Sequence, residues 1–270
     1  MRGAAGADVY MMLAHPIGHA RSPGMFNRLM EENGLDSLMV PATCRPEDFD
    51  RFWDGLSAME NLKGVIVSVP YKTRVFGKCA AAHPRAARVR SANAALRMPD
   101  GTWRADNFDG VGFIDGLKAA KIDIRGENVL LVGAGGAGAS LAYCLAEEGA
   151  AALTISDIDG NRAEELARLV AGAFPACTVA TGASDPRGKT MAVNATPVGL
   201  KPDDPYPMDV EGLSAEMTVI DIIMEPRETR LLRYAAALGC RVQYGQPMMD
   251  LQMKAMGEFL KVLEGPKRHD

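Results

Sequence analysis

The sequence predicts an α/β protein built from two consecutive α/β units. Short β-prone runs alternate with helix-like stretches almost throughout, which is typical of parallel strands joined by crossover helices. The alternation restarts more clearly at Asn128, and a glycine-rich loop directly follows the strand that begins there. With 270 residues, 47% of them hydrophobic, the chain is long enough to form two domains.

The first half consists of short strands separated by helices. Strands are expected at residues 9–13, 38–43 and 64–69, and helices at residues 24–33 and 47–59. Residues 91–123 separate the two halves and contain the turn Pro99-Asp100-Gly101. We place the domain boundary near Asp109 or Gly110, so the first domain spans residues 1–109.

The second half repeats this organisation with a stronger signal. Five further strands are expected, at residues 128–132, 151–156, 191–195, 217–223 and 240–244. They define a second domain of residues 110–245. Apolar residues then recur at helical spacing over residues 248–262, which predicts a terminal helix within residues 246–270.

Composition and charge exclude several classes of protein. The formal net charge is -4, from 30 basic and 34 acidic residues, so nothing electrostatic favours a nucleic acid or membrane partner. A small-molecule substrate is expected instead. The N-terminus lacks the apolar core of a signal peptide, and no run approaches the roughly 18 apolar residues of a membrane span. The five cysteines are scattered, without disulfide or metal spacing, so we expect a cytoplasmic protein without a bound metal.

A glycine loop of G-x-G-x-x-G spacing stands between a predicted strand and a predicted helix. Gly133 permits the tight turn, Gly135 allows the backbone to approach a pyrophosphate, and Gly138 allows the helix to pack closely on the strand. The candidate cofactor contacts in this loop are Gly133, Gly135, Gly136, Ala137 and Gly138. The loop and its context predict a Rossmann-type, doubly wound dinucleotide-binding domain.

The acid that follows the second strand of this domain indicates which dinucleotide is preferred. Asp157 stands where such domains place a carboxylate on the adenosine ribose, and Asp159 is the alternative. A carboxylate there accepts hydrogen bonds from the ribose hydroxyls and repels a 2′-phosphate. NAD is therefore expected in preference to NADP.

Lys72 is the candidate for proton transfer. The run from Gly64 to Lys72 leads a strand through a proline-bounded turn and places this lysine at the start of the next helix. The helix dipole disfavours a positive charge at that position, so an amine there can exchange a proton with a substrate hydroxyl. An exposed surface lysine is the alternative interpretation.

Eight ordered motifs together give the chain a family resemblance. The motifs are residues 15–23, 64–72, 92–93, 107–110, 133–138, 194–199, 221–232 and 245–252. In this order they resemble the shikimate/quinate dehydrogenase family along nearly the whole chain. The resemblance implies an N-terminal α/β substrate domain facing a Rossmann domain, with a C-terminal helix that returns to the first domain. It also implies hydride transfer between a nicotinamide dinucleotide and the CH–OH group of shikimate, quinate or a similar cyclic hydroxy acid, by a monomer or homodimer.

The resemblance assigns roles to individual residues. It makes Lys72 and Asp109 the catalytic pair, in which Asp109 orients the lysine. The implied substrate contacts are Ser22, Ser68, Asn93 and Gln252. The implied cofactor contacts outside the glycine loop are Asn194, Thr196, Pro197 and Met249.

Five positions that are usually polar in shikimate dehydrogenases are apolar here. They are Ala20, Ile66, Ala94, Phe108 and Met224. Each lost hydrogen bond to a buried substrate group costs about 1–3 kcal/mol. We therefore expect a substrate less polar than shikimate, or a related hydroxy acid held differently. The competing hypothesis is a catalytically weak NAD-binding protein that senses a metabolite or supports a partner. A methylene-tetrahydrofolate-type dehydrogenase fits the motifs poorly.

Overall fold

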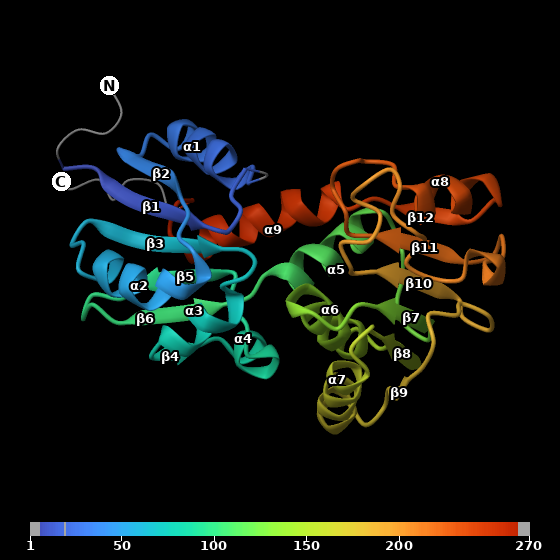
Figure 1. Ribbon diagram of the computed structural model, residues 1–270. Helices are drawn as coiled ribbons and strands as arrows, with labels where there is room; N and C mark the ends of the chain where they lie inside the picture. Colours follow the sequence, from blue (N-terminus) through green and yellow to red (C-terminus); the bar gives the residue numbers. More distant parts are fainter. Residues whose placement is uncertain (1–5, 19, 264–270) are drawn as a thin grey trace. The chain divides into compact units, whose positions relative to one another are not determined.

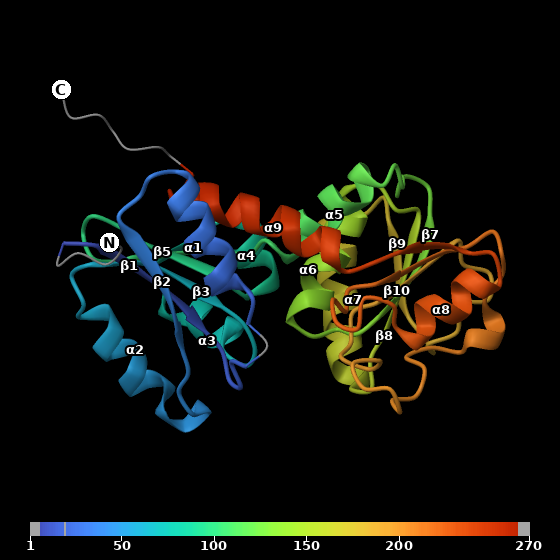
Figure 2. The same cartoon turned by 90° about the horizontal axis from the view of Figure 1, so that it is seen from above.

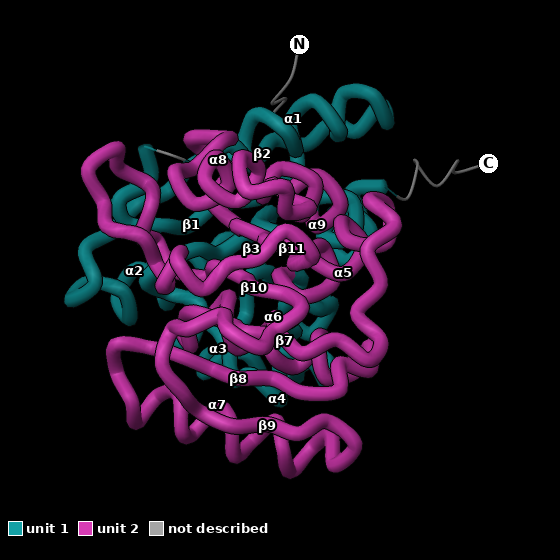
Figure 3. The backbone as a smooth tube through the Cα atoms, turned by 90° about the vertical axis from the view of Figure 1, so that its right-hand side faces the viewer, with its two compact units in different colours: residues 1–108, 253–270 teal, residues 109–252 magenta. Residues whose placement is uncertain are grey.

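The computed structural model describes residues 6–18 and 20–263, and it divides the chain into two compact units (Figure 3). Unit 1 comprises residues 1–108 and 253–270, and unit 2 comprises residues 109–252. The division falls between Phe108 and Asp109 and again after Gln252. The terminal helix α9 (Gln246–Phe259) therefore begins in unit 2 and ends in unit 1.

The described residues of unit 1 form one mixed sheet of six strands in the order β2-β1-β3-β5-β6-β4 (Figure 1). The strands are β1 (Asp8–Leu13), β2 (Ser37–Ala42), β3 (Leu62–Val67), β4 (Ala81–Ala82), β5 (Ala94–Arg97) and β6 (Trp103–Asp106). The helices are α1 (Ser22–Glu32), α2 (Phe49–Ser57), α3 (Lys72–Lys78) and α4 (Pro84–Val89), with a 3-10 turn η1 (Pro46–Asp48) before α2.

The pairing in this sheet differs from the all-parallel prediction at one place. Strand β1 pairs in parallel with β2 and β3, as expected. Strand β5, however, runs antiparallel to both β3 and β6. The turn at residues 98–102 explains the pairing of β5 with β6, because the Asp100 carboxylate accepts bonds from the Thr102 backbone N–H and hydroxyl and closes a hairpin.

Helices cover both faces of the unit 1 sheet. Helix α1 and the last part of α9 lie on one face, and α2 lies on the other (Figure 2). The alternating side chains of β3 explain this division, since Val65 and Val67 join the core beneath α2 with Trp53 and Trp103. On the opposite face, the Tyr10 hydroxyl donates to the Leu260 carbonyl at 3.2 Å.

Unit 2 contains a second six-stranded sheet, and here every pairing is parallel, as predicted. The order is β12-β11-β10-β7-β8-β9. The strands are β7 (Asn128–Val132), β8 (Ala152–Ser156), β9 (Thr178–Thr181), β10 (Met191–Asn194), β11 (Thr218–Asp221) and β12 (Arg241–Gln243). The helices are α5 (Asp109–Ala119), α6 (Gly136–Glu147), α7 (Gly160–Ala173) and α8 (Arg230–Ala237), with a 3-10 turn η2 (Val210–Gly212).

The sheet of unit 2 reverses its strand order between β7 and β10. From β7 the chain proceeds through β8 to β9 in one direction, and then returns past β7 to β10, β11 and β12. This is the doubly wound topology, and ligands bind such sheets at the carboxyl ends of the strands beside the reversal. The predicted α/β class is confirmed. None of the described helices has the length and apolarity that a membrane span requires.

Candidate active site

The glycine loop of unit 2 has the geometry of a dinucleotide turn. Gly133 follows β7 with φ of 108°, and a β-carbon there would lie 2.9 Å from the Ala195 carbonyl oxygen. A β-carbon on Gly138 would lie 1.9 Å from the Gly133 carbonyl oxygen, so only glycine lets α6 start this close to the strand. By contrast, a β-carbon on Gly135 would meet nothing within 4 Å. The backbone before α6 is thus open to a ligand, and the helix N-terminus is suited to a pyrophosphate.

Asp157 lies against this loop. One oxygen of its carboxylate accepts a hydrogen bond from the Ala134 backbone N–H at 2.6 Å, and the other accepts from the Asp159 N–H at 2.9 Å. Asp159 caps the N-terminus of α7, where its side chain accepts from the Arg162 N–H. The structure therefore brings Asp157, and not Asp159, to the glycine loop.

The loop after β10 lies beside the same turn. The buried Asn194 side chain accepts from the Thr196 N–H at 3.0 Å and from its hydroxyl at 2.7 Å. Its amide donates to the Val198 carbonyl and to Asp221, both at 3.1 Å. Asn194 shapes the loop by these bonds, while Thr196 and the exposed Pro197 stand further out.

Asp221 is a buried acid for which no role was predicted from the sequence. Its carboxylate accepts hydrogen bonds from Asn194, from the Ile223 N–H at 3.1 Å and from the Thr229 hydroxyl at 2.8 Å. Burial raises the pKa of Asp221 to about 6, and these three donors oppose that rise. An acid at a strand end with a threonine eight residues later is the only sequence signal of this network.

Lys72 is the first residue of α3, as predicted, and it is half-buried. Its backbone carbonyl accepts from the Ala92 N–H at 3.0 Å, and Ala92 precedes Asn93. The Asn93 carbonyl accepts in turn from the Val67 N–H at 2.8 Å, and Ser68 is the next residue. Lys72, Ser68 and Asn93 therefore lie together at the carboxyl end of β3.

Ser22 and Asn93, two predicted substrate contacts of unit 1, are both buried. Ser22 is the first residue of α1 and is 6% exposed. Asn93 is 1% exposed, and its side-chain oxygen accepts from the Phe108 N–H at 2.9 Å. Part of the bonding capacity of Asn93 is therefore used to hold the residue before Asp109.

Asp109 and Gln252 form a buried pair within unit 2. Asp109 begins α5, where a carboxylate is favourable for the helix dipole, and it is 4% exposed. The Gln252 amide nitrogen donates to the Asp109 carboxylate at 2.7 Å. The predicted contact Met249 is half-buried in the first turn of the same helix α9.

Two of the five apolar replacements are direct neighbours in the unit 1 sheet. Ile66 of β3 faces Ala94 of β5 in the antiparallel register, and both are buried. Phe108 is also buried, but its ring packs 5.5 Å from the Phe259 ring, so it fills space in the core. Met224 belongs to unit 2, whereas Ile66, Ala94 and Phe108 belong to unit 1.

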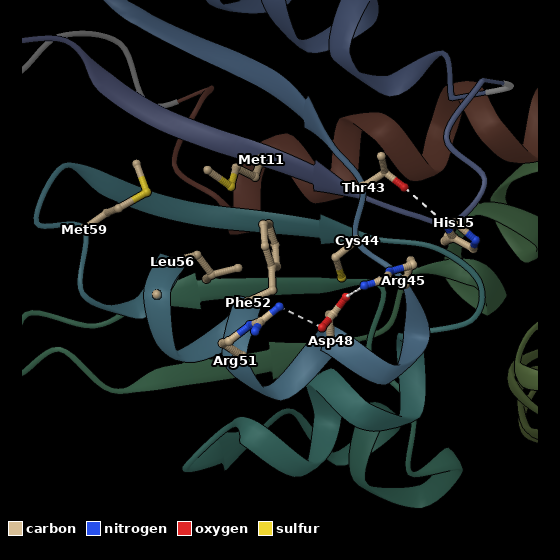
Figure 4. A pocket seen from close by; sticks show the side chains of 11 residues that line it. Met11, His15, Thr43, Cys44, Arg45, Asp48, Arg51, Phe52, Leu56 and Met59 are labelled. Atoms are coloured by element: carbon tan, nitrogen blue, oxygen red, sulfur yellow. Dashed lines mark hydrogen bonds and ion pairs between the residues drawn. The ribbon is translucent and has the colours of Figure 1, made fainter.

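One cavity of the structure involves none of the predicted catalytic or substrate residues. It has a volume of about 720 Å³ and lies on unit 1, with walls that include Met11, Phe52 and Leu56 (Figure 4). Arg45 and Arg51 at its edge both bond Asp48 at 2.8 Å, and Glu47 lies 3.7 Å from Arg45. These opposite charges balance, so the cavity indicates no particular ligand. The described residues also contain no cluster of His, Cys, Asp and Glu that could hold a metal ion.

Comparison with known proteins identifies the family. The family model for the shikimate dehydrogenase substrate binding domain matches residues 12–95. A shikimate dehydrogenase (NADP(+)) from Rhodospirillum rubrum is 34% identical over 249 residues, covering 90% of this chain and 88% of that protein. The chain belongs to the shikimate dehydrogenase family. The motif-based resemblance is thereby confirmed.

Solved structures of similar proteins agree with the fold. Shikimate 5-dehydrogenase from Listeria monocytogenes, in complex with shikimate and NAD, has a TM-score of 0.86 at 26% identity and covers 97% of both chains. The ligand-free 5-ketofructose reductase of a Gluconobacter strain has a TM-score of 0.83 at 27% identity, covering 96% of this chain and 98% of that one. A nicotinamide dinucleotide is common to the relatives whose names state a cofactor. Because those names include both NADP and NAD, the preference for NAD stays a prediction.

Proposed function

We propose that this protein is an NAD-dependent dehydrogenase that oxidises the CH–OH group of shikimate, quinate or a less polar cyclic hydroxy acid, or catalyses the reverse reduction. The observation that carries the proposal is the glycine loop with Asp157 bonded to the Ala134 N–H. It combines an open pyrophosphate turn with a carboxylate at the place where a ribose is held.

The residues of unit 2 suit NAD better than NADP. In our proposal the backbone from Gly135 to Gly138 holds the pyrophosphate, and Asp157 accepts bonds from the adenosine ribose hydroxyls. A 2′-phosphate would bring a second negative charge to this carboxylate, with an energetic cost that NAD avoids. Thr196, Pro197 and Met249 complete the proposed cofactor contacts, with Asn194 supporting their loop from within.

Lys72 and Asp109 handle the proton in this proposal. The nicotinamide ring, when bound, exchanges a hydride with the substrate carbon. In the oxidation direction Lys72 takes the proton that leaves the hydroxyl oxygen, and in the reduction direction it returns one. Asp109 provides the negative charge that balances the protonated lysine, and Gln252 fixes the orientation of that carboxylate by its hydrogen bond.

Ser22, Ser68 and Asn93 are the proposed polar contacts for the substrate. The pair Ile66 and Ala94 presents apolar side chains on one face of the sheet, at two positions where the family resemblance implies hydrogen-bonding ones. Such a surface offers no compensation for desolvating an extra substrate hydroxyl. This is why we favour a ligand with fewer hydroxyl groups than shikimate. The similarity to 5-ketofructose reductase supports a substrate other than shikimate, because that protein is named for a different substrate and has a similar sequence identity to this chain.

The test is a steady-state assay of the purified protein with NAD and NADP. The substrates are shikimate, quinate and cyclic hydroxy acids that lack one or two of the shikimate hydroxyls. We expect the highest kcat/KM with NAD and one of the less hydroxylated acids. A double variant, Ile66→Asn with Ala94→Thr, should shift the preference towards shikimate by about tenfold or more, as expected for one regained hydrogen bond.

Three outcomes would contradict parts of the proposal. Efficient turnover of shikimate by the unchanged protein would show that other side chains compensate for the apolar pair. A higher kcat/KM with NADP would remove the proposed role of Asp157. Binding of NAD without turnover of any compound would favour the metabolite-sensing protein instead.

A further inference from the structure

We propose that Arg85 is a positioning residue for Asp109, acting through Asp106 and Phe108. This inference rests on the proposed function, in which Asp109 belongs to the proton-handling pair. Arg85 itself touches neither Asp109 nor any proposed ligand contact among the interactions of the described residues. It holds the three-residue segment 106–108, from which the chain continues directly into Asp109.

The first contact of Arg85 is an ion pair with a buried acid. Its Nε donates to one oxygen of the Asp106 carboxylate at 2.8 Å, and its terminal nitrogen donates to the other at 2.7 Å. Asp106 is only 2% exposed, and the same carboxylate also accepts from the Asn107 N–H at 2.7 Å. Two parallel charged bonds fix both the position and the plane of the carboxylate, which one ammonium group cannot do.

The second contact is with the ring of Phe108. The Arg85 guanidinium carbon lies 4.6 Å from the ring centroid, a cation–π distance. Phe259 packs 5.5 Å from the same ring, and the Phe108 N–H donates to Asn93. Both the ring and the backbone of Phe108, the residue before Asp109, are therefore held in place. Arg85 contacts both Asp106 and Phe108.

The held segment is connected to Lys72 within unit 1. Asn93, which accepts from Phe108, follows Ala92, whose N–H donates to the Lys72 carbonyl. The chain therefore leaves unit 1 from a point fixed relative to the start of α3. Loosening Asp106 or Phe108 would let the backbone in front of Asp109 move, and a displacement of about 1 Å costs a catalytic group up to about a hundredfold in rate.

The experiment compares Arg85→Gln, Arg85→Lys and Phe108→Leu with the unchanged protein, using the substrate identified above. Arg85→Gln should lower kcat about ten- to a hundredfold, leave the KM for NAD within about twofold, and increase the primary deuterium isotope effect on hydride transfer. Arg85→Lys should recover part of kcat, because it restores the charge but not the paired bonds. Phe108→Leu keeps the apolar packing and should give a smaller fall. Arg104→Ala, at an exposed arginine of the neighbouring β6, is the matched control and should change none of these values.

Hydrogen exchange tests the same inference without any assay of activity. In Arg85→Gln the backbone amides of Asn107 and Phe108 should exchange at least about tenfold faster, while those of β1 stay unchanged. If Arg85→Gln does not fold, Phe108→Leu provides both measurements. Unchanged exchange, or a lower unfolding temperature with kcat and the isotope effect unchanged, would overturn the inference. An unchanged protein that turns over no compound would contradict the proposed function alone, and exchange would still decide the role of Arg85.

Discussion

At the scale of single residues, one lysine carries the proposed chemistry. Lys72 begins α3, and its backbone carbonyl accepts a hydrogen bond from the N–H of Ala92, the residue before Asn93. The position of Lys72 is therefore fixed by the sheet. The sequence predicted its place at a helix start. The contact between that place and Asn93, 21 residues further along the chain, follows only from the antiparallel addition of β5 to β3.

Replacing Lys72 by alanine removes the group that exchanges the proton. We expect kcat to fall by about two to four powers of ten, as for the loss of a general acid or base. The affinity for NAD should stay nearly unchanged, because the proposed cofactor contacts all belong to unit 2. Lys78→Ala is the control, since Lys78 ends the same helix and pairs with Asp50 at 3.0 Å. A kcat equal to that of the control would remove Lys72 from the mechanism.

Asp221 makes the stability of the fold depend on pH. Its pKa is raised to about 6 in the folded protein, so the fold binds a proton that the unfolded chain releases between about pH 4 and 6. This contribution to stability is fully present below about pH 4 and is lost as the pH rises through 6. Asp221→Asn cannot titrate, and its amide can keep bonds to Asn194, Ile223 and Thr229.

The free energy of unfolding of Asp221→Asn, taken relative to that of the unchanged protein, should therefore increase by about 2 kcal/mol from pH 4.5 to pH 7.5. Urea denaturation at the two pH values measures this difference. Asp203→Asn, at an exposed position of the same unit, should show no comparable change. A difference that is constant with pH would show that the buried carboxylate does not titrate in this range.

At the scale of elements, close packing of α5 against α9 gives Asp109 its partner. A β-carbon on Gly112 would lie 2.4 Å from the Met248 carbonyl oxygen and 2.7 Å from the Gln252 β-carbon. Only glycine lets the two helices approach until Gln252 reaches the Asp109 carboxylate. The two glycines of Asp109-Gly110-Val111-Gly112 have low helix propensity, but the structure makes these residues the first turn of α5. Tertiary packing explains why these glycines stand in a helix, although their low helix propensity disfavours one.

Gly112→Ala should force α9 away from α5. The added methyl group meets backbone atoms, which cannot move aside, so we expect about 1–3 kcal/mol of destabilisation and a lower kcat through the loss of the Gln252 bond. Gly172→Ala is the matched control, because a β-carbon there in α7 meets nothing within 4 Å. That change should stabilise the protein by up to about 1 kcal/mol. Equal effects of the two substitutions on urea denaturation would contradict the packing argument.

At the scale of the whole molecule, each unit has its own sheet and its own hydrophobic core. The proposed cofactor contacts all lie in unit 2, so cofactor binding should stabilise that unit in particular. At a NAD concentration one hundred times its Kd, linkage predicts about 2.7 kcal/mol of protection. Hydrogen exchange of β7 and β8, compared with β1 and β3, measures it. Equal protection of the strands in both units would show that the units open together.

The sequence by itself determined the class of the fold, five of the six strands of the parallel sheet in unit 2, the glycine loop and the family; it did not predict β9. These depend on local patterns, since strand runs, glycine spacing and helix starts are read within about ten residues of the chain. The tertiary structure alone decided which of these residues meet. It brought Asp157 to Ala134, Gln252 to Asp109 and Arg85 to Asp106, across 23, 143 and 21 residues of chain. Such contacts are set by strand order, helix packing and burial, which no local pattern contains.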